Sequence, residues 1–166
     1  IKVDATFDAA SNTLTPTAPL ADGVYAVSVG LTDLAGNVSS LSPALSITID
    51  NVAPLAPPAP DLTDTSDTGT SSTDNITKVS APVFTVPAPA AGETPALYVD
   101  GVKVAATFDA ATNTLTPDNA LTDGVYSITS TVTDAAGNES PQSAPIQVTI
   151  NTSSPTAHAA PDITAA

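Results

Sequence analysis

The segment KVDATFDAASNTLTPTAPLADGVYAV at 2–27 returns as KVAATFDAATNTLTPDNALTDGVYSI at 103–128, and this repetition decides the fold. The same offset of 101 positions relates LTDLAGNVSS at 31–40 to VTDAAGNESP at 132–141. Self-similarity at a fixed period indicates repeated structural units, and a period near 100 residues is the length of a small domain. The sequence therefore predicts tandem copies of one domain.

The position of the repeat within the chain predicts three pieces of unequal completeness. The first piece matches only the second half of the repeat, so it is expected to lack the opening strands. The last piece, after a Pro-containing linker, matches only the beginning of the repeat. We expect the C-terminal part of one repeat at 1–50, a complete repeat at 51–151, and a linker with the first strand of a further repeat at 152–166.

Short alternating runs separated by turn residues predict an all-β repeat. About seven strands are expected, at 56–63, 79–86, 96–99, 102–108, 113–117, 124–134 and 143–150. Asp100-Gly101 predicts a tight hairpin, because both central residues of a type I′ turn need positive φ. Tyr126, in the box DGVY, is placed to fold its hydroxyl back onto the preceding corner, as in the tyrosine corner of Greek-key sandwiches. These signals predict a two-sheet β-sandwich.

Charge and composition exclude several classes of function. The chain has 17 Asp and Glu residues against three Lys or Arg, for a net charge of -14. Nucleic-acid binding needs clustered basic residues, so no nucleic-acid partner is expected, and anionic membranes are disfavoured for the same reason. No apolar run reaches membrane-spanning length, so direct membrane insertion is not expected. The absence of Cys excludes disulfides and zinc–thiolate sites.

Catalytic constellations are equally scarce in the sequence. His158 is the single histidine, and it lies in the linker-like segment SSPTAHAAP. Without Cys or a second His, no nucleophile and base pair is apparent, and the Asp residues lie in polar loops that would not desolvate them. We therefore expect no enzymatic activity.

Several strings in order resemble one family of repeats. They are SDTGTSSTDNIT at 66–77, LYVDGVKV at 97–104, LTDGVYSITSTVTDAAGN at 121–138, and VTIN before a Pro-containing linker. Together they resemble the bacterial immunoglobulin-like (Ig-like) repeats of giant secreted adhesins, which depend on calcium and serve attachment or biofilm formation. The resemblance implies immunoglobulin-like Greek-key β-sandwich repeats in tandem, and a location in secreted form at the bacterial cell surface or in the extracellular matrix.

Calcium is the cofactor that the acidic loops predict, because Ca²⁺ takes six to eight oxygen ligands from carboxylates, amides and carbonyls. The sandwich topology predicts that the first loop, 64–75, lies at the end where the chain leaves a repeat and the TDxAGN box at the end where the chain enters it. The linker, the first loop of one repeat and the TDxAGN box of the next would then meet at each junction, where a metal would clamp the two repeats. Three groups of candidate ligands follow: Asp64, Asp67 and Asp74 in the first loop; Asp33 or Asp134 in TDxAGN; and Asp50, Asn51 and the equivalent Asn151 in the linkers.

A simpler interpretation of the same residues stays open. Asp and Asn before Gly are ordinary turn formers whose side chains cap their own backbone, so TDxAGN could be only a hairpin loop. The large negative charge favours cations for the group as a whole, because almost no basic residues offset it.

Two functions from different classes follow. The first is a structural extender that holds a binding domain away from the cell, with neighbouring repeats of the same chain as partners and calcium stiffening the junctions. The second is a subunit of a self-assembling extracellular filament, in which other copies of the chain fill an open sheet edge by strand exchange. A carbohydrate-binding module is disfavoured because aromatic residues do not cluster.

Overall fold

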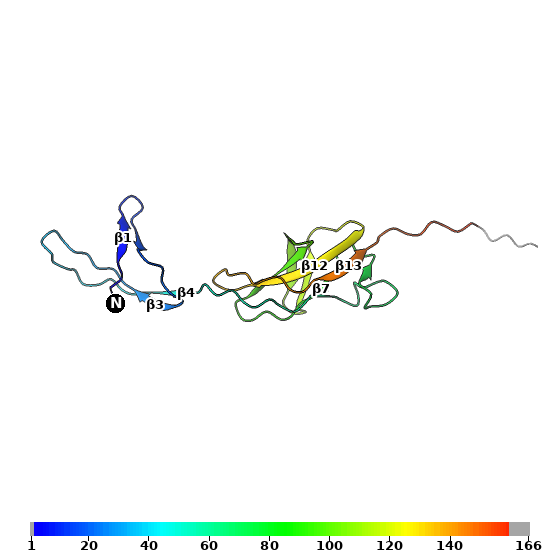
Figure 1. The fold of residues 1–166 in the computed structure, drawn as a ribbon, viewed down its shortest axis with the longest axis horizontal. Helices are drawn as coiled ribbons and strands as arrows, with labels where there is room; N and C mark the ends of the chain where they lie inside the picture. The colour runs from blue at the N-terminus through cyan, green and yellow to red at the C-terminus, as the bar shows by residue number, and fades with distance from the viewer. Residues whose placement is uncertain (1, 160–166) are drawn as a thin grey trace, which may run out of the picture. The chain divides into compact units, whose positions relative to one another are not determined.

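The computed structural model describes residues 2–159 and contains strands without helices in that range (Figure 1). Two compact units are present: unit 1, Ile1–Val52, and unit 2, Ala53–Ala166. The all-β prediction is therefore confirmed.

Unit 1 consists of two separate hairpin-like pairs. Strand β1 (Ala5–Asp8) pairs antiparallel with β2 (Thr13–Pro16), and β3 (Gly23–Val27) pairs antiparallel with β4 (Leu45–Ile49). No further strand of the described residues joins either pair.

Unit 2 is a sandwich of two sheets. One sheet has the order β10-β11-β7-β5 and the other the order β6-β13-β12-β8-β9. The nine strands are β5 (Asp61–Leu62), β6 (Ile76–Thr77), β7 (Phe84–Thr85), β8 (Thr94–Val99), β9 (Val102–Val104), β10 (Ala106–Asp109), β11 (Thr114–Pro117), β12 (Gly124–Thr133) and β13 (Ile146–Ile150).

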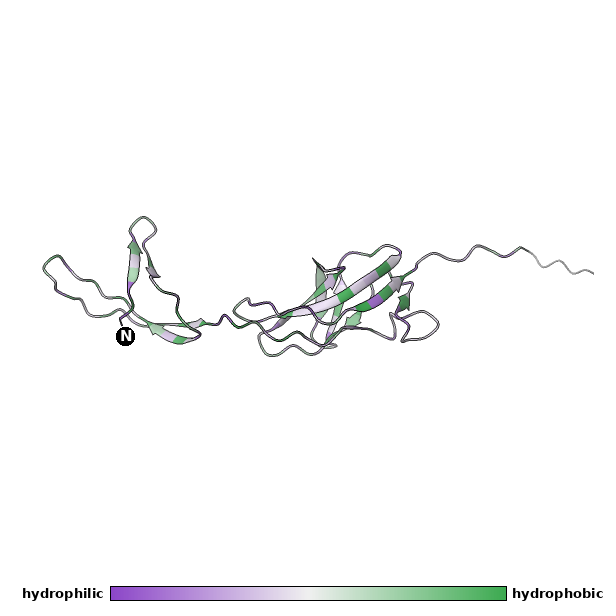
Figure 2. Ribbon diagram, viewed as in Figure 1, coloured by the Kyte–Doolittle hydropathy of each residue, from purple (hydrophilic) through white to green (hydrophobic). Residues whose placement is uncertain are grey.

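Apolar residues from both sheets of unit 2 meet in one core. Figure 2 shows hydrophobic residues set singly among polar ones along the strands, which is the period-two pattern that buries one face of a sheet. The core consists of Leu62, Phe84, Val86, Leu97, Val99, Leu115, Ile128, Val148 and Ile150.

The structure resolves which face of β12 points inward. Ile128 and Val132 are buried, whereas Val125 is 63% exposed. Thr129 and Thr131 on the opposite face are also buried, and their hydroxyls donate to Gln142 and Glu139 of the segment that follows the strand. Both faces of β12 are covered, so its sequence shows no simple alternation.

The strand boundaries differ from the expected ones in several places. The strands expected at 56–63 and 79–86 are only two residues long, β5 at Asp61–Leu62 and β7 at Phe84–Thr85. The run expected as one strand at 102–108 is interrupted at Ala105, because β9 belongs to the five-stranded sheet and β10 to the four-stranded sheet. The polar loop 64–75 leads into an unexpected short strand, β6, which pairs with β13. In the last expected piece, residues 152–159 form no strand, and 160–166 lie outside the described residues.

The two turn predictions are confirmed. Asp100 and Gly101 have φ of 51° and 77°, as a type I′ turn requires. The Tyr126 hydroxyl donates to the Thr122 carbonyl at 3.1 Å, and Tyr25 makes the same contact with Ala21 at 2.8 Å. Each tyrosine thus closes the corner that precedes its strand.

Unit 1 exposes apolar residues that unit 2 buries at the equivalent positions. Leu14 is 47% exposed, whereas its counterpart Leu115 is 1% exposed, and Leu31 is 74% exposed against 8% for Val132. In unit 2, strands β5 to β8 supply the covering residues. Residues 2–52 contain no counterpart of those strands.

Candidate functional site

Unit 2 has two ends, which differ in chemistry. At one end, called distal here, β13 finishes beside β6 and the chain leaves the sandwich (Figure 1). At the opposite end, called proximal, β12 finishes and leads into the loop 134–138. The acidic first loop therefore lies at the opposite end from the TDxAGN box, as the topology predicts.

The first loop holds two carboxyls close together at the distal end. Asp67 is 5% exposed, and its Oδ2 accepts the N–H of Asn75 at 3.0 Å. Asp74 accepts from the Thr70 N–H at 3.0 Å and the Ile76 N–H at 3.1 Å. A Cβ at Gly69 would collide with the Asp74 carboxylate, so a larger residue there would force that carboxylate to shift.

The electrostatics of the loop favour a charged Asp74. Burial is the largest influence on this carboxyl and raises its pKa, but the N–H donors of Ile76 and Ser71 and the Thr70 hydroxyl outweigh it. The pKa of Asp74 therefore lies below its ordinary value. The side chain of Asp67 contributes a further, smaller lowering.

The first loop also contains one unpaired polar atom. Oδ1 of Asp67 is buried and has no hydrogen-bond partner. A buried carboxylate oxygen costs free energy unless a donor, a proton or a metal ion satisfies it. Asp67 and Asp74 are therefore the loop carboxyls placed to meet such a partner, whereas Asp64 of the same loop is exposed to solvent.

Calcium at this end would need oxygens besides carboxylates. Within residues 2–159, no three His, Cys, Asp or Glu side chains gather in a group that could hold a metal ion. Hydroxyls, backbone carbonyls and water would have to supply the remaining ligands, which is common for Ca²⁺.

The TDxAGN box has a different character from the first loop. Oδ1 of Asp134 accepts the N–H groups of Ala136 and Asn138, each at 2.9 Å, and Oδ2 accepts the Asn138 amide at 2.9 Å. Asp33 repeats this arrangement with Asn37 and lies in unit 1. These bonds hold the pKa of Asp134 below its ordinary value, the Asn138 side chain contributing most. The geometry is that of a turn-forming Asp, the simpler of the two interpretations.

The linker residues are tied to their own units. Asn51 donates its N–H and its side-chain amide to Asp22 Oδ1 at 3.0 and 2.7 Å. The Val52 N–H donates to Asp50 Oδ1 at 3.1 Å. In unit 2, Asn151 Oδ1 accepts the Ser153 N–H at 3.1 Å. Of the eight predicted ligands, Asp67 and Asp74 lie in the loop that precedes β6, and Asn151 follows β13, the strand that pairs with β6.

Sequence reasoning missed Asp22 and its equivalent Asp123. Asp123 accepts the N–H and hydroxyl of Thr152 at 2.9 and 2.7 Å and the hydroxyl of Ser153 at 2.8 Å. These bonds, led by the Thr152 hydroxyl, lower the pKa of Asp123. The signal in the sequence is the Asp that precedes Gly-Val-Tyr in both repeats, which the corner motif alone does not link to the linker.

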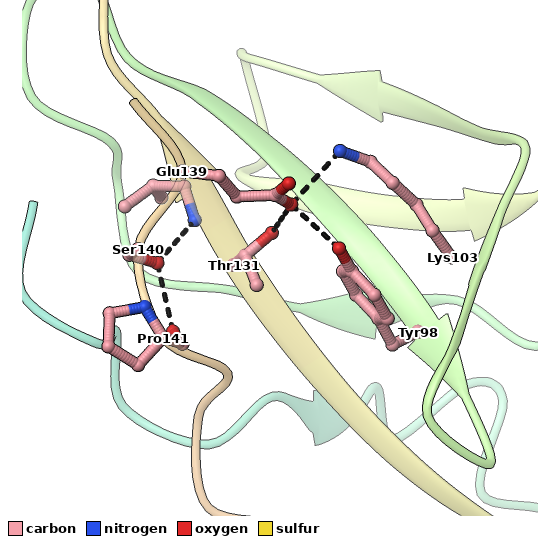
Figure 3. A network of polar contacts seen from close by, with 7 residues as sticks. Tyr98, Lys103, Thr131, Glu139, Ser140 and Pro141 are labelled. Carbon is pink, nitrogen blue, oxygen red and sulfur yellow. Dashed lines mark hydrogen bonds and ion pairs between the residues drawn. The ribbon is translucent and has the colours of Figure 1, made fainter. Parts of the chain in front are cut away.

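A second missed cluster surrounds Glu139, which the structure places beside β8, β9 and β12 (Figure 3). Its Oε1 accepts the Thr131 hydroxyl at 2.6 Å, the Tyr98 hydroxyl at 2.8 Å and the Lys103 ammonium at 3.0 Å. These three donors, Thr131 first, lower the pKa of Glu139 to about 2. Unit 1 has Val38 at the equivalent position, so the repeat itself carried no signal for this cluster.

Comparison with known proteins identifies the repeat. No curated protein matches the chain. The family model of the bacterial Ig-like domain matches residues 2–51 and again residues 54–152, which together make up most of the chain. The two matches cover the same two segments that the structure folds into units 1 and 2. The chain therefore belongs to the bacterial Ig-like domain family.

Proposed function

We propose that this chain is a spacer segment of a bacterial surface adhesin, in which tandem repeats hold a binding domain away from the cell. The observation that carries the proposal is the pair of successive matches to one family, whose domains are usually extracellular or surface-exposed. Such arrays gain length by copy number, because each repeat contacts only its neighbours. Domains of this family are typically structural rather than enzymatic.

The remaining observations agree with a structural role at the surface. Within residues 2–159, no helix has the length and hydrophobicity needed to cross a bilayer. The high negative charge keeps extended chains soluble and apart from one another.

Calcium is proposed to stiffen the repeats at the distal end. The buried Oδ1 of Asp67, close to the charged Asp74, supports a cation there. Asn151 follows β13, and its N–H donates to the carbonyl of Thr77 in β6, directly after the same loop. An ion held by the loop would therefore also restrain the start of the linker.

Thermal melting of the full chain in chelator and in about 5 mM calcium tests this part of the proposal. Extracellular calcium modules bind at roughly 10⁻⁴ to 10⁻³ M, so about 5 mM calcium should stabilise the native state by about 1 to 2 kcal/mol and raise the midpoint by roughly 5 to 10 °C. Asp67→Asn should abolish the response, because an amide keeps the shape but loses the charge.

Asp134→Asn is the matched control, since Asp134 caps its own loop at the opposite end of unit 2. A calcium response that survives in Asp67→Asn but disappears in Asp134→Asn would move the metal to the proximal end. No response in the unmodified chain would remove calcium from the proposal.

A second candidate function rests on unit 1. Its exposed Leu14, Leu31 and Phe7 would be buried by strands of the kind that β5 to β8 provide in unit 2. A copy of the chain that supplied such strands would produce filaments by strand exchange. Light scattering separates the two functions, because a spacer keeps its mass as concentration rises and a filament subunit grows.

A further inference from the structure

The incoming segment of unit 2, residues 54–60, has the sequence PLAPPAP and forms no strand. Its burial follows a period of three. Pro54 and Pro57 are half-buried and Pro60 is fully buried, whereas the residues between them are exposed, with Leu55 at 90%. Three residues per turn is the period of the polyproline II helix. One side of such a helix therefore faces unit 2.

The composition of the segment favours this conformation before any contact is made. Each proline ring fixes its own φ near the polyproline II value and confines the residue before it to extended conformations. The prolines of PLAPPAP thus restrain every position of 54–60 except Leu55. At about 3.1 Å per residue, the segment spans on the order of 20 Å.

The loop 87–93 is the part of unit 2 that lies beside this segment. Residues of both, Pro57 and the half-buried Pro89 among them, line one open groove of about 360 Å³. Val132 of β12 lines the same groove and is 8% exposed, whereas its counterpart Leu31 in unit 1 is 74% exposed. The segment and the loop together therefore shield an apolar side chain of the sandwich from water.

The outgoing segment shows that the sequence spacing alone does not cause this burial. At the offset of 101 positions, Pro155 corresponds to Pro54 and His158 corresponds to Pro57. Pro155 and His158 are both exposed, whereas Pro54 and Pro57 are half-buried. The burial of the incoming prolines therefore comes from contact with unit 2 and not from within the segment.

We propose that residues 54–60 are a polyproline II strut, docked on unit 2 through every third residue, which fixes the direction in which the chain enters unit 2. The prolines stiffen the segment along its length, and the contacts of Pro54, Pro57 and Pro60 attach it to the sandwich. This goes beyond the proposed function, because unit 2 itself sets the direction of the incoming chain without a metal ion.

Pulsed electron spin resonance on the full chain tests the strut, because it measures the distribution of distances between two spin labels. The sequence has no Cys, so Ala53→Cys and Val125→Cys place one label at the start of the strut and the other on β12. Both positions are exposed. We expect a narrow distribution in chelator and the same distribution in about 5 mM calcium.

Pro57→Ala and Pro58→Ala are matched variants of the doubly labelled chain. Each removes one proline ring and frees the residue before it, but Pro57 is half-buried whereas Pro58 is exposed. Neither residue belongs to the core of unit 2, so both variants should fold. Pro57→Ala should roughly double the width of the distance distribution, and Pro58→Ala should leave it nearly unchanged.

Three results would overturn the strut. A broad distribution in the labelled chain without either substitution would show that the segment is not attached to unit 2. Equal broadening in the two variants would assign the stiffness to the proline content and not to docking. A distribution that is narrow only with calcium would assign the restraint to a metal ion.

Discussion

Tyr126 shows how one hydroxyl fixes a chain reversal. Its ring is half-buried and lies beside Gly124, at van der Waals distance from where a Cβ of that residue would be. Its hydroxyl donates a hydrogen bond to the carbonyl of Thr122, four residues earlier. The Thr122 hydroxyl lies 3.0 Å from the hydroxyl oxygen of Tyr126. Because the ring is anchored in unit 2, this contact holds the corner that leads into β12.

Tyr126→Phe is expected to lower the free energy of unfolding of unit 2 by about 1 kcal/mol, the usual net contribution of one such hydrogen bond. The ring still packs, so the fold is unchanged and only the midpoint moves. Chemical denaturation followed by circular dichroism measures the loss. Tyr25→Phe makes the same change in unit 1 and is the control, and an unchanged midpoint in Tyr126→Phe would contradict the corner.

Residue-level prediction succeeded where the chemistry was local. Asp100-Gly101 and Tyr126 act on backbone within a few positions, so sequence alone identifies them. Asp123 and Glu139 act across 29 and 36 positions, on Thr152 and Lys103. Such partners depend on how strands are arranged, which local patterns do not specify. Asp67 was predicted as a ligand, but its burial could be found only in the structure.

At the scale of elements, the segment 140–143 after β12 is attached to that strand by hydrogen bonds from side chains as well as from the backbone. The Ser140 and Ser143 hydroxyls accept the N–H groups of Val132 and Ser130, each at 3.0 Å. Ser39 and Ser42 of unit 1 make the same bonds to Leu31 and Val29. The pattern recurs because serine can accept a backbone donor where a strand has left the sheet. It was hidden in sequence, since Ser is also an ordinary loop residue.

Glu139 joins three strands to this segment, and its pKa gives the contact a pH dependence. The folded pKa is about 2, against 4.5 for the group in its ordinary state. A depressed pKa stabilises the fold above the unfolded value and stops doing so as pH falls through the folded value. The contribution is therefore complete above about pH 5 and lost near pH 2. Because Glu139 is about one-third exposed, solvent screening limits it to about 1 kcal/mol.

Glu139→Gln should accordingly destabilise unit 2 at pH 7 and match the unmodified chain near pH 2. Urea denaturation at a series of pH values measures the free energy of unfolding of both proteins. The difference between the two values at each pH cancels the effect of the other carboxyls, which both proteins share. Glu93→Gln makes the same substitution outside the cluster and is the control. A difference that stays constant from pH 7 to pH 2 would show that charge at Glu139 is not the cause.

At the scale of the whole molecule, the internal repeat of the sequence predicted the domain organisation. The offset between Lys2 and Lys103 predicted tandem domains, and turn chemistry predicted sheets joined by hairpins. The repeat could not reveal the crossing of the chain at Ala105 or the pairing of β6, because both depend on contacts between two sheets. It also could not show that equivalent residues have different surroundings in units 1 and 2.

The different surroundings predict what would complete unit 1. A second copy of residues 53–101, fused to the N-terminus of the chain, would supply counterparts of β5 to β8. Leu14 and Leu31 should then become buried, as Leu115 and Val132 are in unit 2. Burial of apolar side chains is worth roughly 1.5 to 3 kcal/mol each, enough to create a second cooperative unfolding transition.

Calorimetry would show that second transition, and binding of a hydrophobic dye would fall. The added copy of Tyr98 would then face Val38, where unit 2 has Glu139, and Lys2 would stand in the place of Lys103. Their polar groups would lack a carboxylate, so the new transition should lie below that of unit 2. Val38→Glu should raise it by restoring the cluster. A new transition that does not respond to Val38→Glu would mean that unit 1 closes with a different strand register, because only the register of unit 2 brings β8, β9 and this position together.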